Sequence, residues 1–373
     1  MKKIKLVGYL GDKNLGDQIL ADSAEFLINE NILSEQVTVE RYDFSHIGKL
    51  SFLERVGKRI GVKYSFGKIL EKEISKFDLK TFESIDAIVF AGGGMIKYKH
   101  QNCWLHVSLI ISAAIKLKIP VYLHAVGVEG YDEKDERCQL LSKYLNSEVV
   151  KKISTRDDLE TLRERYIKEN IKTERVADSA VLSSSVYNIS KKKSNVIGLG
   201  LVRGDIFKDH GIPFSRNDVV DLYSSLLKEL ESQGIEYQLF TNGLSFDSEL
   251  IADISSKTGL NLQVIEPSSP EQLMEVISNF KGVIAARLHA CIVSYSLDIP
   301  VVGLVWNNKL RMFGQHIGYS DRFLSNEDFN SNEIIKLLNS SINEGYDQAR
   351  RQDYLKSVRC SMASTVAEIM GEE

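Results

Sequence analysis

The residues best suited to chemistry follow a short, strongly apolar segment near the end of the chain. The segment 282–286 predicts a buried strand, and Arg287 and His289 come directly after it, where a helix is expected to begin. An arginine offers a fork of N–H donors, a histidine titrates near neutral pH, and a helix N-terminus adds free backbone N–H groups. This combination predicts a site for a phosphate or a carboxylate. The structural alternative is a core histidine that caps the helix, with Arg287 in an interdomain salt bridge.

Two further basic residues also follow predicted strands. Lys309 comes after the segment 300–305, and Arg156 leaves the end of the segment 150–155. Ligands of open parallel sheets bind beyond the carboxyl ends of the strands, so several cations at strand ends are expected to share one anion. For Arg156, a surface salt bridge with a neighbouring aspartate is the alternative.

Glycine-rich turns follow the first and third predicted strands, at 8–17 and 91–95. Glycines let a backbone approach a ligand closely or adopt positive φ. The candidates for ligand contacts in these turns are Asn14, Gly16, Asp17, Gly93 and Gly94. Asp17 could instead be a plain helix cap, and the second turn a tight strand-to-helix connection. Neither turn is a dinucleotide fingerprint or a P-loop.

Short apolar runs alternate with longer amphipathic stretches, which predicts repeated β-α-β units. The expected strands are 4–10, 36–42, 85–91, 119–126, 150–155, 173–177, 195–202, 236–241, 262–265, 282–286 and 300–305. The expected helices are 16–31, 50–80 (broken near Gly61), 101–118, 132–147, 157–169, 215–233, 246–258, 269–280, 289–298, 330–344 and 346–370.

This pattern predicts an α/β fold of two doubly wound, Rossmann-like domains that face a cleft. The polar tract 190–195 is the predicted linker. The first domain is therefore expected at 1–189 and the second at 194–373. The last helix is a candidate to pack back on the first domain.

Composition restricts the class of protein. The 373 residues suffice for two domains, and 47 basic against 51 acidic side chains give a net charge of −4. Such a chain is not a typical nucleic-acid binder. Four cysteines without a close pair fit a reducing compartment. The longest apolar runs are too short for a membrane span, and the N-terminus does not read as a signal peptide, so a cytoplasmic location is expected.

The chain resembles the polysaccharide pyruvyl transferase family. The segments that carry the resemblance, in order along almost the whole chain, are 14–17, 92–94, Gly127, 154–157, 178–180, 200–203, 287–290 and Lys309. The resemblance implies a two-domain fold like that of the GT-B glycosyltransferases. It also implies transfer of a pyruvyl group from phosphoenolpyruvate to two hydroxyls of a sugar, in a surface polysaccharide or its precursor.

The resemblance assigns roles by position. Arg156, Arg287 and His289 carry over as donor-site residues, with Lys309 as a further cation. The second domain would hold the donor anion, and the first would supply the acceptor side and part of the donor site. The other residues expected to bind substrate are Leu288, Arg203, Asn14, Gly16, Gly93 and Gly94.

The chain departs from the family pattern in two places. Trp306-Asn307-Asn308-Lys309 stands where members often have Tyr-Asp-Pro-Lys, and Glu129-Gly130 stands where Gly-Pro is common. The first departure touches the expected site, so it leaves open a different acceptor or altered chemistry.

The chemistry of the implied donor fits these residues. Phosphoenolpyruvate carries roughly 2.5 to 3 negative charges near neutral pH, so a chain of net charge −4 must concentrate cations locally. Its enol carbon must be protonated, and His289 is the candidate acid. Asp17 is the candidate base or ligand of an acceptor hydroxyl. No cofactor or metal is expected.

Two competing functions remain open at this point. A GT-B glycosyltransferase that uses a nucleotide sugar would share the fold and the phosphate-binding residues. A non-catalytic member that binds a sugar or an anion would share the fold alone.

The segment 49–76 is basic and amphipathic. It holds eight Lys or Arg against three Glu, with apolar residues at near-helical spacing. Such helices favour anionic membrane surfaces, and family acceptors can be carried on a membrane lipid. Peripheral contact with the inner membrane face is therefore one expectation. The alternative is a helix pair that packs on the first domain and exposes a solvated basic face.

Overall fold

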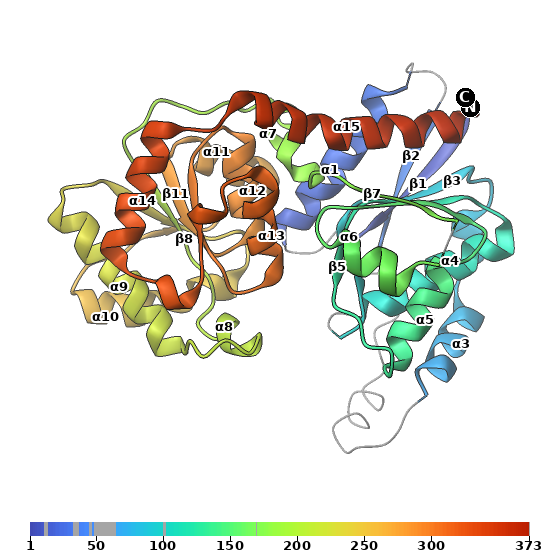
Figure 1. Ribbon diagram of the computed structural model, residues 1–373, viewed down its shortest axis with the longest axis horizontal. Coiled ribbons are helices and arrows are strands. Elements are labelled where there is room, and N and C mark those ends of the chain that lie inside the picture. The colour runs from blue at the N-terminus through green and yellow to red at the C-terminus, as the bar shows by residue number, and fades with distance from the viewer. Residues whose placement is uncertain are drawn as a thin grey trace. The chain divides into compact units, whose positions relative to one another are not determined.

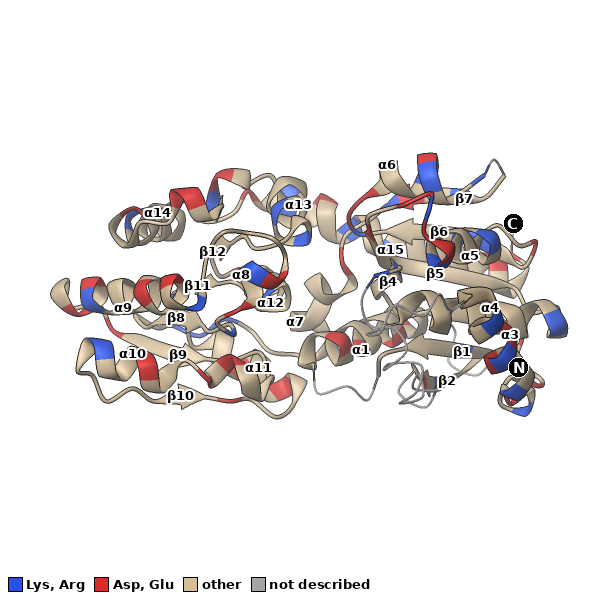
Figure 2. Cartoon of the chain, turned by 90° about the horizontal axis from the view of Figure 1, so that it is seen from below, with Lys and Arg blue, Asp and Glu red and all other residues tan. Residues whose placement is uncertain are grey.

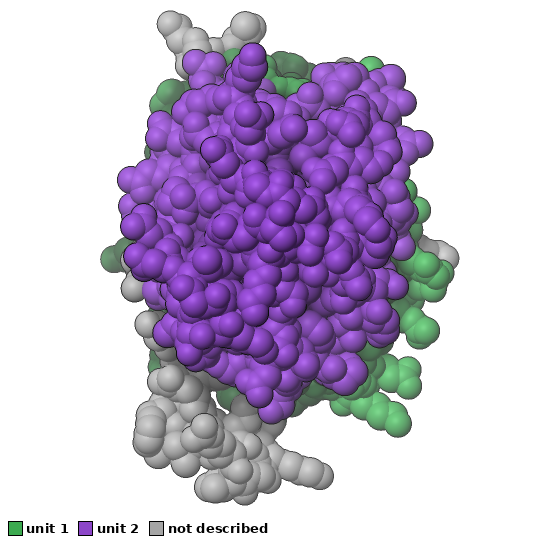
Figure 3. All heavy atoms as spheres, turned by 90° about the vertical axis from the view of Figure 1, so that its left-hand side faces the viewer, with its two compact units in different colours: residues 1–12, 20–178, 356–373 green, residues 13–19, 179–355 purple. Residues whose placement is uncertain are grey.

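The computed structural model describes residues 1–10, 14–32, 37–44, 47, 65–99, 102–168 and 170–372. The chain divides into two compact units, shown in green and purple in Figure 3. Unit 1 comprises Met1–Asp12, Leu20–Asp178 and Lys356–Glu373, and unit 2 comprises Lys13–Ile19 and Ser179–Leu355. The boundary therefore falls at Asp178, and the tract 190–195, expected as a linker, lies inside unit 2.

Unit 1 is built on a parallel sheet of seven strands (Figure 1). The strands are β1 (Lys2–Gly8), β2 (Val37–Asp43), β3 (Ala87–Phe90), β4 (Gly93–Lys97), β5 (Val121–Glu129), β6 (Val150–Thr155) and β7 (Lys172–Arg175). Their order is β2-β1-β3-β5-β6-β7, and β4 pairs with β5. β3 and β5 are buried over most of their length, as expected for parallel strands covered on both faces.

Helices cover both faces of this sheet. On one face lie α3 (Phe66–Lys76), α4 (Cys103–Leu117) and α5 (Glu136–Leu145) (Figure 1). On the other lie the parts of α1 (Leu15–Glu30) and α15 (Gln348–Met370) that belong to unit 1. Lys152 of β6 donates to the Ser361 carbonyl at 3.0 Å, and the Ala177 N–H donates to Ser357 Oγ at 2.9 Å. These bonds join the end of the last helix to unit 1.

Unit 2 holds a second parallel sheet, of six strands. They are β8 (Ile197–Gly200), β9 (Tyr237–Phe240), β10 (Val264–Ile265), β11 (Gly282–Ala285), β12 (Val301–Leu304) and β13 (Phe323–Leu324). The order β10-β9-β8-β11-β12-β13 reverses between β8 and β11. This is the strand order of the dinucleotide-binding folds, in which ligands bind at the carboxyl side of the reversal.

The helices of unit 2 also form two layers (Figure 1). α9 (Arg216–Ser232), α10 (Ile251–Thr258) and α14 (Ser331–Glu344) lie on one face, and α11 (Pro270–Ser278), α12 (Leu288–Ser296) and α13 (Asn308–Ile317) lie on the other. A short helix, α8 (Ile206–Asp209), follows β8. α9 begins with a capping box between Ser215 and Asp218, which stabilises its first turn. The predicted fold class, two doubly wound α/β units, is confirmed.

Several elements were not expected from the sequence, among them β4, β13 and α13. β4 and β13 are short strands, and α13 begins directly after Trp306-Asn307. The expected helix at 157–169 is wrong beyond its first turn, because the helix continues only to Thr161 and a wide π-helical turn follows at Leu162–Tyr166. Short elements carry too few residues for a clear hydrophobic period, so pattern reasoning passes over them.

The basic segment 49–76 is described only from residue 65 onward. Its described part is α3, whose Ile69 and Leu70 are buried in the core of unit 1. The Phe66 ring packs edge-on against Trp104 at 5.6 Å between centroids. The apolar side of α3 therefore faces its own unit. Among the described residues, no helix is both long and apolar enough to cross a membrane.

Candidate active site

The candidate site in unit 2 lies where the order of the strands reverses. β8 and β11 are neighbours at this point, and their carboxyl ends lead into Arg203 and Arg287 respectively. Arg287 is the N-cap residue of α12, so the strand hands the chain directly to a helix N-terminus. Sequence reasoning expected this geometry for Arg287, Leu288 and His289, which occupy the junction between β11 and α12.

Arg287 is held by a buried carboxylate. Its Nε donates to Asp247 Oδ2 at 2.9 Å, and its Nη2 donates to Asp247 Oδ1. The Asp247 side chain is fully buried, whereas 15% of the Arg287 side chain is exposed. The Phe246 ring lies 5.6 Å from the guanidinium carbon, within the range of a cation–π contact. Arg287 is thus fixed on one side and open on the other.

Asp247 also links two of the strand ends. Its Oδ1 accepts a hydrogen bond of 3.1 Å from the backbone N–H of Arg203. Burial raises the pKa of the Asp247 carboxyl above its usual value, and the hydrogen bonds from Arg287 and Arg203 act in the opposite direction. The Arg203 guanidinium itself pairs with Asp209 at 2.5 Å. Both arginines at the strand reversal therefore have carboxylate partners.

His289 is buried, with 8% of the residue exposed, and lies against the first turn of α1. A Cβ atom on Gly16 would lie 1.9 Å from His289 Nδ1 and 2.3 Å from its Cγ. Only a glycine at position 16 lets the helix backbone approach the imidazole this closely. Unit 2 thus brings together two predicted site residues that are 273 positions apart in the sequence.

We expect Gly16→Ala to displace the His289 ring and to lower turnover by roughly 10²-fold, the usual cost of misplacing a reacting group by about 1 Å. Helix propensity alone favours alanine over glycine and so predicts a more stable variant, whereas the steric clash with His289 predicts a less stable and less active one. Steady-state kinetics measures the turnover of the variant, and thermal melting measures its stability.

Gly67→Ala is the matched control, because Gly67 is likewise the second residue of its helix. A Cβ there would first meet the flexible carboxylate of Glu136, at 3.1 Å. This variant should keep full turnover. Equal turnover of the two variants would contradict the contact between Gly16 and His289.

Asn14 and Asp17 form the cap of α1. Asn14 Oδ1 accepts from the Gly16 N–H at 3.2 Å, and Asn14 Nδ2 donates to Asp17 Oδ2 at 2.8 Å. The Asp17 N–H in turn donates to the Asn14 carbonyl at 3.0 Å. Asn14 is therefore the residue that caps α1, and Asp17, in the first turn of the helix, binds the side chain of that cap. Asp17 is half-buried and directly follows Gly16, which contacts His289. A catalytic role for its carboxylate stays a prediction.

The departure at Trp306-Asn307-Asn308 keeps a helix cap. Asn307 is the N-cap of α13, and its side chain accepts from the Leu310 N–H at 3.1 Å. Asparagine and aspartate are both strong N-cap residues, so an asparagine can replace the family's aspartate here. Trp306 Nε1 donates to the Ala286 carbonyl at 2.5 Å, which ties the end of β12 to the end of β11. Lys309, half-buried, occupies the first turn of α13.

Arg156 belongs to unit 1 and is deeply buried. Its Nη1 donates to Asp178, and its Nε lies 3.9 Å from Asp157 Oδ2. The alternative role expected for Arg156 was a surface salt bridge with a neighbouring aspartate. The neighbouring Asp157 does lie close, but the surface position was wrong, because only 7% of Arg156 is exposed. Arg287, His289 and Lys309 belong to unit 2. That the four cations share one anion stays a prediction.

The glycine turn after β3 leads into a strand and not into a helix. Gly92 and Gly93 have φ of +88° and +78°, which only glycine adopts without strain. The turn directs β4 alongside β5, where Gly93 pairs with Val126. The alternative given for this turn, a tight strand-to-helix connection, is therefore wrong. A contact of Gly93 or Gly94 with substrate remains a prediction.

Sequence reasoning missed three residues near the strand reversal. Asp247 and Phe246 lie in a loop, several residues after β9, and nothing in their spacing points to Arg287. Asn242 lies two positions after the last residue of β9. This position next to a strand end could have marked it as a candidate. It is 3% exposed, and its Oδ1 has no hydrogen-bond partner in the described part of the chain. A buried acceptor at the carboxyl edge of a sheet is suited to a ligand or a water molecule.

Charged residues elsewhere in unit 2 are mixed in sign. Lys and Arg are interspersed with a larger number of Asp and Glu along α9 and α14 (Figure 2). Such mixed surfaces create little net attraction for an anion. In the residues that the structure describes, no group of three or more His, Cys, Asp or Glu is placed to hold a metal ion.

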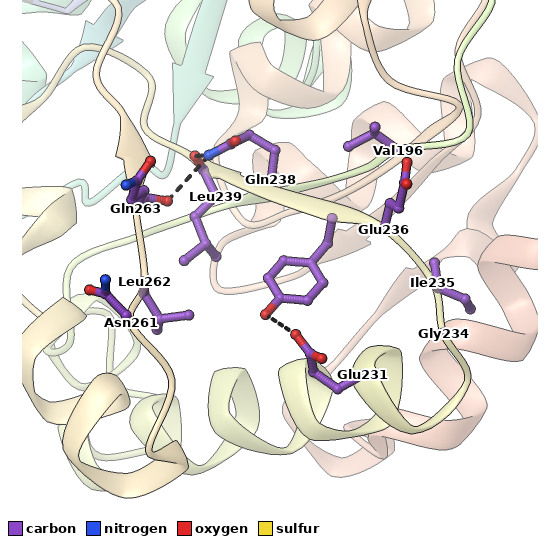
Figure 4. A pocket seen from close by; sticks show the side chains of 11 residues that line it. Val196, Glu231, Gly234, Ile235, Glu236, Gln238, Leu239, Asn261, Leu262 and Gln263 are labelled. Carbon is purple, nitrogen blue, oxygen red and sulfur yellow. Dashed lines mark hydrogen bonds between the residues drawn. The ribbon is translucent and has the colours of Figure 1, made fainter.

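A hollow of about 640 Å³ lies at the opposite edge of the unit 2 sheet (Figure 4). It is lined by the end of α9, the start of β9 and the segment 261–263. Gln238 Nε2 donates to the Gln263 carbonyl at 3.2 Å across it. The hollow borders the amino end of β9, whereas the candidate residues follow carboxyl ends. It is therefore separate from the candidate active site.

Comparisons with known proteins agree with this architecture. The model of the polysaccharide pyruvyl transferase family matches residues 14–308.

The UDP-GlcNAc 2-epimerase of Methanocaldococcus jannaschii has a TM-score of 0.60 at 15% identity, over 98% of this chain and 99% of that one. The epimerase of Neisseria meningitidis, solved with UDP-GlcNAc bound, has a TM-score of 0.59 at 13% identity, over 99% of both chains. A glycosyltransferase from Rickettsia africae has a TM-score of 0.52 at 13% identity, over 100% of this chain and 99% of that one. These likenesses show a GT-B-type fold. Comparison with curated proteins found no match.

Proposed function

The chain belongs to the polysaccharide pyruvyl transferase family, and from this premise we propose that it transfers a pyruvyl group from phosphoenolpyruvate to two hydroxyls of a sugar. The product is a cyclic ketal on a surface polysaccharide or its precursor. The observation that carries the proposal is the Arg287-Leu288-His289 junction, which places a cation, a titratable group and a helix N-terminus together at the strand reversal of unit 2.

The donor would bind at this junction through its two anionic groups. The backbone N–H groups in the first turn of α12 and the partly exposed side of Arg287 suit a phosphate or a carboxylate. Lys309, at the start of α13, would add a further positive charge. Arg156, whose Nη1 donates to Asp178 in unit 1, is the further cation proposed for the donor.

His289 would act as the general acid. It donates its proton to the methylene carbon of the enol, which leaves the adjacent carbon electrophilic. One sugar hydroxyl adds to that carbon and loses its proton, and the carbon–oxygen bond to phosphate then breaks. The second hydroxyl adds in turn and loses its proton, which closes the ketal. One of the two hydroxyl protons restores His289. Asp17 is the proposed acceptor of the other and passes it to the departing phosphate, which leaves as HPO4²⁻ while the Asp17 carboxylate is restored.

Thermal melting with candidate donors tests the choice of donor. A ligand that binds only the folded state, at about 100 times its Kd, adds about 2.7 kcal/mol to the free energy of unfolding. We expect phosphoenolpyruvate to raise Tm and UDP-GlcNAc to leave it unchanged. The reverse would support a nucleotide-sugar enzyme, as the likeness to an epimerase solved with UDP-GlcNAc and to a glycosyltransferase suggests. A shift with phosphoenolpyruvate but no turnover would support a non-catalytic binding protein.

A cytoplasmic location, with peripheral contact between the segment 49–76 and the inner membrane face, forms part of the proposal. Its test is sedimentation with anionic vesicles at low and high salt, comparing the unchanged chain with a Lys58→Glu, Arg59→Glu, Lys63→Glu variant. The matched control reverses the three exposed lysines at 191–193. Salt-sensitive binding lost only in the first variant supports the contact. Absence of binding at low salt would contradict it.

A further inference from the structure

A short loop helix, η5 (Ser245–Ser248), holds Arg287 from two sides. Asp247 takes the Nε and Nη2 edge of the guanidinium, and Phe246 lies 5.6 Å from the guanidinium carbon. The two contacting residues are adjacent in sequence and belong to the connection between β9 and α10. Rotation of the guanidinium would therefore cost both a charged pair and an aromatic contact.

The way in which Arg287 is bound leaves its other edge available. A guanidinium carries five N–H donors in a planar fork. Asp247 takes one from Nε and one from Nη2, so one N–H of Nη2 and both of Nη1 remain. The remaining N–H of Nη2 and one N–H of Nη1 point the same way and form the end-on edge of the fork, which suits a second carboxylate or a phosphate. Arg287 can therefore bind Asp247 and a substrate anion at once.

The burial of Asp247 is hard to explain by stability alone. Its side chain has no exposure, and its oxygens receive three N–H groups, two from Arg287 and one from the Arg203 backbone. A buried ion pair often stabilises a fold no more than apolar side chains of similar volume. Asp247 also places a negative charge beside the expected anion, which by charge alone weakens anion binding. A contribution of Asp247 to function would explain why a carboxylate stands at this buried position.

We propose that Asp247 is a positioning residue that fixes the Arg287 guanidinium with its end-on edge toward the donor anion. The inference rests on the proposed function for the identity of that anion. An arginine that is already held in the binding orientation loses less conformational freedom when an anion binds. It therefore binds the anion more tightly than an arginine that must first be ordered. The gain from orientation exceeds the repulsion from the Asp247 charge.

Asp247→Asn tests this inference, because charge and orientation predict opposite results. The amide retains the shape and one acceptor oxygen but removes the negative charge. Charge alone predicts tighter binding of phosphoenolpyruvate, whereas loss of orientation predicts a Kd about 10-fold or more higher. Isothermal titration with phosphoenolpyruvate measures Kd. Asp221→Asn is the matched control, since it makes the same charge change at an exposed salt bridge of the same unit and should leave Kd within about twofold.

A double-mutant cycle separates positioning from general damage. With Arg287→Ala already present, adding Asp247→Asn should raise Kd no further, because there is no guanidinium left to orient. A further 10-fold loss in the double variant would overturn the inference. So would unchanged or tighter binding by Asp247→Asn alone.

A spectroscopic readout keeps this test independent of the donor. In the unchanged protein the Arg287 Nε–H should give a protected NMR signal, because it is bonded to a buried carboxylate. The signal should broaden or exchange rapidly in Asp247→Asn. Failure of the unchanged protein to bind phosphoenolpyruvate would overturn the proposed function, whereas an unaltered Nε–H signal in a folded Asp247→Asn variant would overturn the positioning role.

Discussion

His289→Ala should lower kcat by about 10²- to 10⁴-fold while changing the Kd for phosphoenolpyruvate much less. The reason is that proton transfer to the enol carbon occurs only in the transition state, whereas the donor is held mainly by Arg287 and the helix N-terminus. Single-turnover kinetics with titration of the donor separates the two quantities. His289→Gln should be as slow as His289→Ala, because it keeps polarity and much of the volume but cannot donate the required proton.

His316→Gln is the matched control for the histidine variants. His316 lies in the last turn of α13, in the same unit, and has no place in the proposed chemistry. It should retain full turnover. Full turnover by a folded His289→Gln protein would remove His289 from the role of acid and leave it as a packing partner of Gly16.

Arg287→Ala should raise the Kd for phosphoenolpyruvate by at least about 10-fold, because hydrogen bonds to charged groups are worth about 1.5–3 kcal/mol. It should also lower the free energy of unfolding by about 3–5 kcal/mol, since Asp247 loses its partner inside the protein. Each Asp247 oxygen would also lose one of the hydrogen bonds that lower the pKa of this carboxyl, so burial would raise that pKa further. Titration and thermal melting measure the two effects.

Arg287→Lys separates donor binding from stability. A lysine can keep a charge beside Asp247, so most of the stability should return. It cannot present a second planar edge, so most of the donor affinity should stay lost. Lys257→Ala, which removes an exposed cation paired with Asp221 in the same unit, should change neither quantity by much. Recovery of full donor affinity by Arg287→Lys would contradict an end-on arginine contact.

The fold could be predicted from the sequence because it depends on repetition. Buried strands such as β11 and β12 alternate with amphipathic helices, and a parallel sheet covered on both faces is the arrangement that buries them all. The family was also predicted and is confirmed, since its motifs occur in order and the family model matches most of the chain. Short elements such as β4 and β13 were missed because two to five residues carry no period.

The candidate site was predictable only where a residue is adjacent to a strand. Arg287 and His289 follow β11 directly, so their place at the carboxyl edge follows from topology. The partners of these residues could not be predicted in the same way. Asp247 reaches Arg287 through the conformation of a loop, and Gly16 reaches His289 across 273 positions of sequence, and neither contact has a local signature.

The most direct test of the account supplies the donor with a ¹³C label in its pyruvyl carbons. The protein is incubated with labelled phosphoenolpyruvate and a saccharide extract, including lipid-linked saccharides, from cells that lack this protein, so the acceptor need not be known beforehand. We predict that phosphate release and transfer of the label to a saccharide ketal occur in equal amounts, and that both are lost in His289→Gln. If the label stayed in phosphoenolpyruvate while an added nucleotide sugar was consumed, the chain would not be a pyruvyl transferase in function.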